Sequence, residues 1–423
     1  MYAKNLKIYG FKCFGKAELN LQYPSSRRGT LRLKNVNVIL GDNGGGKSSI
    51  LRALAIAILA PILNESGFVP YRLVRRSPQQ DYGASALVKV EGSATGFDRP
   101  TNMAGTRKKW ELLARLERVG DGNRDRLHLE HTPYSPFVEL LFDDTSPAYF
   151  VVGYGATRRV ETGDFSESSA RRSRGLRYRR IAGLFEDHVT LRPLRSWFFE
   201  LQRRQRKRFP EAVDLINKVL PQAVVLTGDF DIEDGEPIFL FNGNPTPFSA
   251  LSDGYKSFIG WIVDLVGHLV DVAPDDTSID RIPGIVLVDE IDLHLHPEWQ
   301  RSVIPTIANA FPRIQFIFTT HSPLVAATVE SDNVYVTELG DDGSTGVRQP
   351  SERLFGRGPE DILLSSYFGL ESTRPDALVE ERDLLFLQAA KGDARAALRY
   401  VDQLISGPPP VDMDSPNERS KLK

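Results

Sequence analysis

The 423-residue chain contains a single cysteine, Cys13, which excludes any intrachain disulfide. This scarcity favours a reducing compartment. Residues 1–14 alternate polar and apolar side chains and lack the apolar core of a secretory signal. The longest apolar run, residues 50–63, includes Arg52 and Pro61, is too short to cross a bilayer, and fits a buried helix. We therefore expect a cytoplasmic protein with no membrane segment.

The chain also lacks a large net charge, because 53 Lys and Arg residues nearly balance 55 Asp and Glu residues. Any nucleic-acid contact must come from a local patch. One such patch is visible between Arg158 and Arg208, where fifteen basic residues accompany six acidic ones. It predicts non-specific nucleic-acid binding, which replacement of Arg171, Arg172 and Arg174 would test. A solvated loop or a subunit contact is the alternative, and the sequence leaves both open.

Several kinds of site are missing as well. No internal repeat is visible, and we find neither an acidic nuclease cluster nor a histidine-rich nuclease motif. His294 and His296 alternate like a zinc pair, but no third or fourth ligand cluster accompanies them. We interpret these two histidines as structural. If nucleic acid is cut, a separate partner must cut it.

What the chain does contain is a glycine-rich phosphate loop of the pattern G-x-x-x-x-G-K-S at residues 41–48. An apolar, strand-like run at 36–40 precedes it, and a helix-like run rich in Ala, Leu and Ile follows at 50–59. This order places backbone N–H groups at a helix N-terminus, where a polyphosphate can bind. The predicted nucleotide-binding residues are Gly41, Asp42, Asn43, Gly44, Gly45, Gly46, Lys47, Ser48 and Ser49.

Three later segments predict the rest of a nucleotide site. Residues 285–288 form an apolar run of strand length that ends in Asp289 and Glu290, so a buried strand presents two carboxylates at its tip. Asp289 is suited to hold Mg²⁺ together with Ser48, and Glu290 to polarise the attacking water. A second inner strand at 314–320 precedes His321, which we expect near the γ-phosphate. Residues 251–257, LSDGYKS, begin a predicted helix at 254–270 and offer Ser252 to an anion.

Taken together, these motifs resemble the ATP-binding-cassette ATPases of the RecF/SMC-like branch. The segments that carry the resemblance are LKIYGFKCF, GDNGGGKSS, LSDGYKS, VLVDEIDLHLHPEWQ and FIFTTHSP. The combination of LSDGY, DLHLHPEWQ and TTHSP is close to a group of stand-alone bacterial ATPases that includes the PtuA subunits of Septu-type and retron-linked antiphage systems.

The resemblance implies a role for each matching residue. Lys47 lies in the Walker A loop, Asp289 is the Walker B metal ligand, Glu290 the catalytic base and His321 the switch histidine. Asp292 is the D-loop acid, and Ser252 and Gly254 are the signature residues that contact the nucleotide of a second head. The family's Q-loop glutamine has no clear match, and the equivalent segment is expected near residues 154–158.

The resemblance also implies a function. We expect a Mg²⁺-dependent ATPase that dimerises through its heads, or forms a higher homo-oligomer, and controls a nuclease or nucleic-acid partner in antiphage defence. The alternatives are a recombination or repair ATPase of RecF/SMC type and a nucleotide-gated scaffold with little turnover.

The expected fold class is α/β: a P-loop ABC-ATPase head with a mixed sheet, an antiparallel β subdomain and a helical insert. Residues 1–155 form the N-terminal lobe with the phosphate loop, and 156–222 a basic, partly helical insert. Residues 223–350 form the C-terminal lobe with the signature, the acidic strand and His321. Residues 351–406 are predicted to be a helical extension and 407–423 a disordered tail.

Overall fold

The computed structural model describes residues 1–26, 31–76, 85–98, 109–120, 122–129, 140–160, 175–233 and 235–406. The chain divides into two compact units. The first contains Met1–Ile362 and Ser366–Phe368, and the second contains Leu363–Ser365 and Gly369–Lys423. The tail predicted at 407–423 lies outside the described residues.

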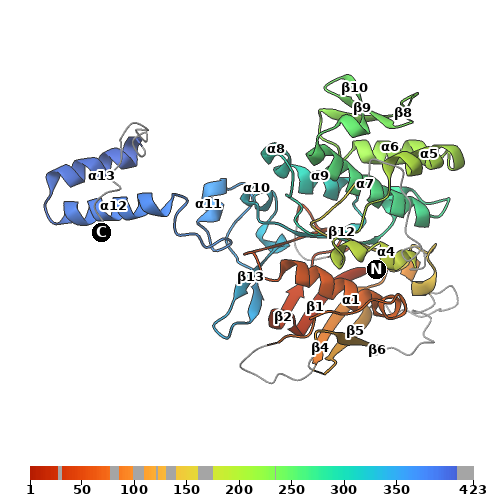
Figure 1. Cartoon of the computed structure of the whole chain (residues 1–423), viewed down its shortest axis with the longest axis horizontal. Coiled ribbons are helices and arrows are strands. Elements are labelled where there is room, and N and C mark those ends of the chain that lie inside the picture. The colour runs from red at the N-terminus through yellow and green to blue at the C-terminus, as the bar shows by residue number, and fades with distance from the viewer. Residues whose placement is uncertain are drawn as a thin grey trace. The chain divides into compact units, whose positions relative to one another are not determined.

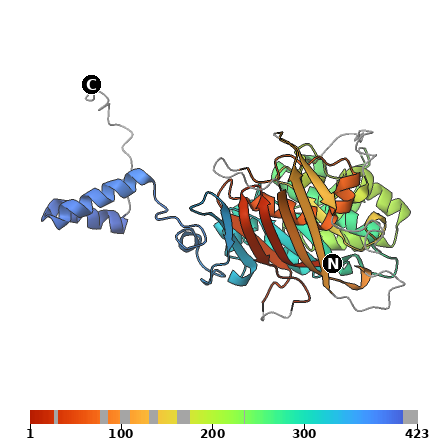
Figure 2. The same ribbon diagram turned by 90° about the horizontal axis from the view of Figure 1, so that it is seen from below.

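A mixed eleven-stranded sheet forms the first unit, in the order β6-β5-β4-β1-β2-β14-β13-β3-β12-β11-β7. Its strands are β1 Tyr2–Phe11, β2 Phe14–Asn20, β3 Val36–Gly41, β4 Ser85–Ser93, β5 Lys109–Arg118, β6 Asp125–Leu129, β7 Val151–Tyr154, β11 Gly284–Val288, β12 Ile314–Thr319, β13 Val334–Leu339 and β14 Thr345–Arg348. Neighbours from β13 to β7 pair in parallel, whereas β2, β1, β4, β5 and β6 pair antiparallel. Figure 2 shows the strands of residues 2–20 and 85–118, in red to orange, side by side.

The parallel strands are buried on both faces, which explains their continuous apolar sequences. Successive residues of β12 alternate between two cores: Phe316 and Phe318 face one, and Ile317 faces the other. Helix α1, Lys47–Glu65, lies in the second core. Helices α5 Leu194–Arg204, α6 Arg208–Asn217, α7 Asp253–Val272 and α9 Val303–Ala310 supply the first core (Figure 1).

Helix α1 is, within the part of the chain that the structure describes, the one helix long and apolar enough to cross a membrane, and most of it is buried in the second core.

The predicted α/β class is confirmed, with one difference in how the antiparallel strands are arranged. Strands β4–β6 extend the main sheet and do not form a subdomain of their own. A separate antiparallel sheet is built from β8 Val224–Phe230, β9 Pro237–Phe241 and β10 Asn244–Pro247. The strand-like runs at residues 224–230 and 237–241 predict its first hairpin from the sequence alone. The third strand gives no such signal, because β10 contains two prolines and lies at the edge of the sheet.

The remaining elements are short or C-terminal. In the first unit they are α4 Leu176–Arg179, α8 Pro297–Gln300 and α10 Pro323–Ala326. The region expected to be a helical extension contains α11 Pro359–Leu363, α12 Asp376–Ala390 and α13 Ala394–Ser406. The domain boundaries at 155, 222 and 350 stay predictions, and all three fall inside the first compact unit.

Candidate functional site

The phosphate loop joins β3 to α1, and its glycines are required by its geometry. Gly44 and Gly46 have φ of 80° and 88°, values that side chains disfavour. A Cβ on Gly46 would lie 2.4 Å from Cys13 Sγ, and one on Gly41 would lie 2.1 Å from Thr337 Oγ1. Gly46 is also the N-cap of α1, so the loop delivers its free N–H groups to the start of that helix.

A cavity of about 320 Å³ opens beside this loop and brings together residues distant in sequence. Glu290 and His321, from the ends of β11 and β12, line it opposite the loop. The other lining residues are Lys12, Cys13, Asn43, Gly44, Gly46, Lys47, Ser48, Ser49 and Arg52. The neighbouring strands β3, β12 and β11 explain this convergence, because ligands of parallel sheets bind at the carboxyl ends of the strands.

Lys47 is held at the centre of the loop. Its Nζ donates to the carbonyls of Gly41 (2.9 Å) and Asp42 (3.0 Å), and lies 2.5 Å from Nε2 of His321. Burial lowers the pKa of Lys47, and Asp289 and Glu290 oppose that shift. Burial, followed by the charge of Lys47, lowers the pKa of His321, so its imidazole is neutral and accepts from the lysine at neutral pH.

The acidic pair after β11 is fixed by Thr319, the last residue of β12. Thr319 Oγ1 donates to Asp289 Oδ1 (2.5 Å) and accepts from the backbone N–H of Glu290 (2.8 Å). Asp289 is buried, and Glu290 has a left-handed φ of 48° that directs the chain sharply out of the strand. One threonine therefore orders both carboxylate-bearing residues.

The next residues continue the same arrangement. Asp292 Oδ1 accepts from the Thr320 hydroxyl. Ser322 caps α10 by accepting from Val325 N–H, and donates to Gln300 Oε1 at 2.6 Å. The segment that carries His321 is thus tied to the segment that follows the acidic pair.

Arg158 is a site residue that the sequence placed in the expected Q-loop segment and at the start of the basic patch, without a role in the nucleotide site. Its Nη1 donates to the carbonyl of Asp289 (3.0 Å), and its Nη2 to the carbonyl of Glu290 (2.9 Å). Burial lowers the pKa of Arg158 to about 10, so the guanidinium is still cationic at neutral pH. Lys12 and Arg52 also line the cavity, and neither was assigned a role from the sequence: Lys12 lies within the LKIYGFKCF segment and Arg52 in the helix-like run after the phosphate loop.

The signature residues lie away from this cavity. Ser252 is the exposed N-cap of α7, and Gly254 is the second residue of that helix. A Cβ on Gly254 would lie 2.7 Å from the His294 carbonyl, so a side chain there would push α7 away from the segment after the acidic strand. The two residues do not line the cavity of their own chain.

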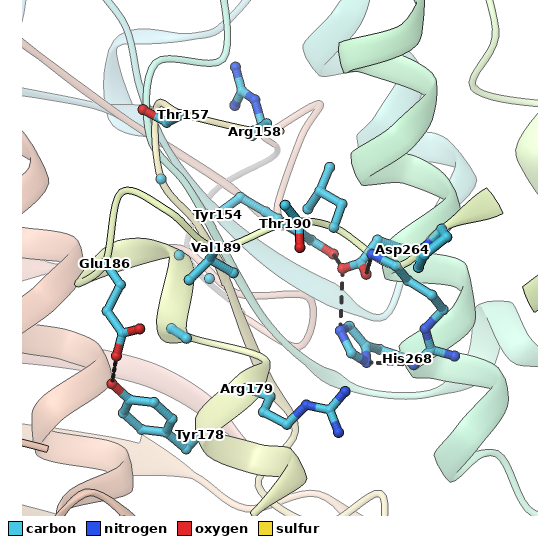
Figure 3. Close-up of a pocket in the computed structure, with 17 residues that line it drawn as sticks. Tyr154, Thr157, Arg158, Tyr178, Arg179, Glu186, Val189, Thr190, Asp264 and His268 are labelled. Atoms are coloured by element: carbon cyan, nitrogen blue, oxygen red, sulfur yellow. Dashed lines mark hydrogen bonds and ion pairs between the residues drawn. The ribbon is translucent and has the colours of Figure 1, made fainter. Parts of the chain in front are cut away.

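A second cavity, of about 140 Å³, lies between β7 and α7 and contains a buried polar network (Figure 3). The Tyr154 hydroxyl donates to Asp264 Oδ2 (2.8 Å), and His268 Nε2 lies 3.3 Å from the same oxygen. Tyr154 also accepts from the N–H of Asp289 through its backbone carbonyl, at 2.8 Å. The network therefore connects the signature helix to the strand beside the acidic pair.

The donor set fits Mg²⁺, a hard cation that proteins bind through one or two carboxylates together with substrate phosphates. Asp289, directly after β11, supplies a carboxylate, and Ser48, in the first turn of α1, supplies a hydroxyl. His296 instead caps α8, where its Nδ1 accepts from Glu298 N–H. Across the described ranges, no cluster of three or more His, Cys, Asp or Glu side chains is placed to hold a metal.

Comparison with known proteins agrees with this geometry. Residues 139–327 match the family model described as "AAA domain, putative AbiEii toxin, Type IV TA system", and residues 5–76 match another described as "AAA domain". The first match covers the acidic strand and His321, and the second covers the phosphate loop.

Two curated relatives extend over most of the chain. The Septu protein PtuA of Bacillus mycoides is 26% identical over 99% of this chain and 49% of its own length. The Retron Vc95 probable ATPase of Vibrio cholerae is 25% identical over 91% of this chain and 81% of its own length. The chain thus spans about half the length of that PtuA. These relatives confirm the predicted resemblance to PtuA-type ATPases, and the name of the second agrees with the predicted enzyme class.

Among solved structures, an Smc head bound to the C-winged helix domain of ScpA is similar to this chain. The match has 17% sequence identity and a TM-score of 0.47, and covers 82% of this chain and 97% of that one.

Proposed function

We propose that this chain, a relative of PtuA-type and retron ATPases, hydrolyses ATP with Mg²⁺ in a bacterial antiphage system. The observation that carries the proposal is the cavity in which the phosphate loop, Glu290 and His321 face one another. Chain segments separated by more than two hundred residues converge there, in the arrangement that nucleotide hydrolysis requires.

The residues divide the chemistry among them. Lys47 exchanges the loop carbonyls for β- and γ-phosphate oxygens, and the N–H groups at the start of α1 bind the remaining oxygens. Glu290 accepts a proton from the attacking water, and His321 donates to the γ-phosphate in its neutral form. Asp289 and Ser48 would hold Mg²⁺, which neutralises charge on the phosphates when it is bound.

A Lys47→Ala variant tests this function. We expect ATP turnover to fall at least about a hundredfold, because one preorganised cation on the transferred phosphate is lost. Phosphate release measured under saturating ATP reports the effect. Lys34→Ala, a change of an exposed lysine, is the control and keeps wild-type turnover. Absence of ATP turnover in the wild-type protein would contradict the proposed ATPase activity and favour a nucleotide-gated scaffold.

We also propose that two heads close on two nucleotides. Ser252 and Gly254 lie outside the cavity of their own chain, on the exposed start of α7, where a second head can reach them. This arrangement makes ATP a bridge between subunits that hydrolysis releases. The partner that such a dimer controls is a nuclease or another nucleic-acid enzyme, because this chain carries no nuclease motif in its sequence.

In the described part of the basic insert, fewer basic side chains are available to contact nucleic acid than the sequence predicts. Arg158, Arg177 and Arg180 are buried. Arg192 pairs with Asp271 at 2.7 Å, and Arg208 donates to the Thr277 carbonyl at 2.8 Å. Arg171, Arg172 and Arg174 lie outside the described residues.

Arg159 and Arg179 are exposed outside α5. The other exposed cations among the described residues between Arg158 and Arg208 form a ridge on α5 and the turn after it. Its cations are Arg195, Arg203, Arg204, Arg206 and Lys207. Phe199, 55% exposed, lies among them and can stack on a base. The ridge carries one acid, Glu200, which pairs with Arg204. We propose that this ridge contacts the phosphate backbone without reading sequence.

Replacing Arg203, Arg204, Arg206 and Lys207 with serine tests the ridge. We expect the slope of log affinity for duplex DNA against log salt to become shallower by about 3 to 4, since each phosphate contact contributes about 0.9. Fluorescence anisotropy over a salt series measures that slope. Lys16→Ser with Lys34→Ser, two exposed lysines elsewhere, is the control. An unchanged slope in the ridge variant would show that nucleic acid does not bind there.

A further inference from the structure

We propose that Arg158 is a positioning residue for ATP hydrolysis, which holds the backbone of Asp289 and Glu290 so that the Glu290 carboxylate faces the phosphate-loop cavity. The inference rests on the proposed function, and assigns a role in hydrolysis to a residue that the sequence placed in the expected Q-loop segment and the basic insert without such a role. Arg158 does not line the phosphate-loop cavity, so it acts through the backbone that it binds.

The geometry is that of a two-pronged clamp. The two terminal nitrogens of the guanidinium bind two consecutive carbonyls, those of Asp289 and Glu290, at 3.0 and 2.9 Å. A planar fork with fixed spacing restrains both peptide groups together, which a lysine ammonium cannot do. The Arg158 side chain is 8% exposed, so little water competes for these bonds.

The backbone that Arg158 binds includes Glu290, whose conformation needs restraint. Glu290 is a non-glycine residue with φ of 48°, a conformation that persists only where surrounding contacts determine it. Thr319 binds the N–H of Glu290, and Arg158 binds its carbonyl. The two hydrogen bonds restrain the N–H and the carbonyl of Glu290, and thereby fix the direction of its Cα–Cβ bond.

The position of Arg158 follows from the sheet. Strand β7 pairs in parallel with β11, with Tyr154 opposite Val288. Arg158 comes four residues after Tyr154 and returns over the end of β11, next to Thr157 at the rim of the second cavity (Figure 3). The edge strand of the sheet thereby supplies the clamp for its neighbour.

The chain offers a matched control in Arg177. This arginine is also buried, 2% exposed, and also binds backbone carbonyls, those of Ala148 (2.8 Å), Leu140 (2.9 Å) and Asp143 (2.7 Å) among them. It lines neither the phosphate-loop cavity nor the second cavity. A purely structural role of Arg158 predicts that both arginines behave alike.

Steady-state kinetics and nucleotide binding of the full chain separate these possibilities. For Arg158→Ala we expect kcat to fall about tenfold to a hundredfold, since a small misplacement of a catalytic group costs rate steeply. The KM and the Kd for ADP should stay within about threefold of wild type, because the phosphate loop is untouched. Arg158→Lys should recover part of the lost kcat, as one carbonyl regains a charged donor.

Arg177→Ala should lower the melting temperature while kcat per folded molecule stays near wild type. If Arg158→Ala keeps wild-type kcat, or if Arg177→Ala loses kcat to the same extent, the positioning role is wrong. Hydrogen exchange provides a readout that needs no turnover. Exchange at residues 289–291 should rise in Arg158→Ala and not in Arg177→Ala, and equal exchange there would also overturn the proposal. An inactive wild-type protein with the expected exchange pattern would instead contradict the proposed function alone.

Discussion

Replacing Glu290 with glutamine is expected to stop ATP hydrolysis while leaving ATP bound. Glutamine keeps the size of the side chain and the left-handed backbone held by Thr319 and Arg158, but cannot accept a proton from water. Loss of a general base costs about 10²- to 10⁴-fold in rate. Lys47 and Asp289 are unchanged, so the nucleotide and its metal contacts remain. The variant should accumulate as an ATP-bound dimer.

The measurements are phosphate release, and the mass and nucleotide content of the protein after gel filtration with ATP. Glu298→Gln provides the control, because it is the same exchange at an exposed glutamate in α8. Wild-type turnover in Glu290→Gln would remove Glu290 from its assigned role. A monomer that retains ATP would separate the catalytic assignment from the proposed dimer.

The second large effect concerns the shared site. Ser252→Arg introduces a long cation at the exposed start of α7 and should abolish turnover by blocking the site that this signature completes, without preventing nucleotide binding to the single chain. Lys47→Ala should abolish turnover by removing the phosphate-loop contribution to the site, whereas Ser252→Arg affects the signature contribution. If the site is composite, each mixed dimer of the two variants contains one intact site, and a mixture recovers about a quarter of wild-type turnover.

Recovery in the mixture is the decisive measurement, because a site formed within one chain cannot be repaired by two defective copies. Ser351→Arg, at an exposed serine elsewhere in the first unit, controls for the added charge. Normal turnover of Ser252→Arg would show that the signature residues are misassigned. Two inactive variants that do not complement would place the defect of Ser252→Arg within its own chain.

The sequence predicts this molecule well wherever local chemistry decides the structure. The phosphate loop, its helix and the strand before Asp289 follow from glycine spacing and continuous apolar runs, and β8 and β9 were predicted with their observed bounds. Pairings between distant segments are less visible, because hydrophobic alternation does not specify which strands are neighbours. The continuity of β4–β6 with the main sheet is such a case.

The arginines show a second limit of prediction from the sequence, which concerns the burial of charged side chains. Counting charges between Arg158 and Arg208 predicts a solvated, cationic surface, yet Arg158 and Arg177 are buried, with their terminal nitrogens donating to backbone carbonyls. A composition cannot reveal which carbonyls a fold leaves unpaired at the ends of its strands. The clamp at Glu290 could therefore be recognised only once β7 and β11 were seen side by side.

The close packing of Cys13 against the phosphate loop makes this residue a useful labelling site. The sole thiol of the chain lies against Gly46 and lines the phosphate-loop cavity. A thiol-reactive fluorophore can therefore be attached at one defined atom without removing any other cysteine. A change in its emission when nucleotide binds or dissociates would allow both rates to be measured by stopped-flow fluorescence.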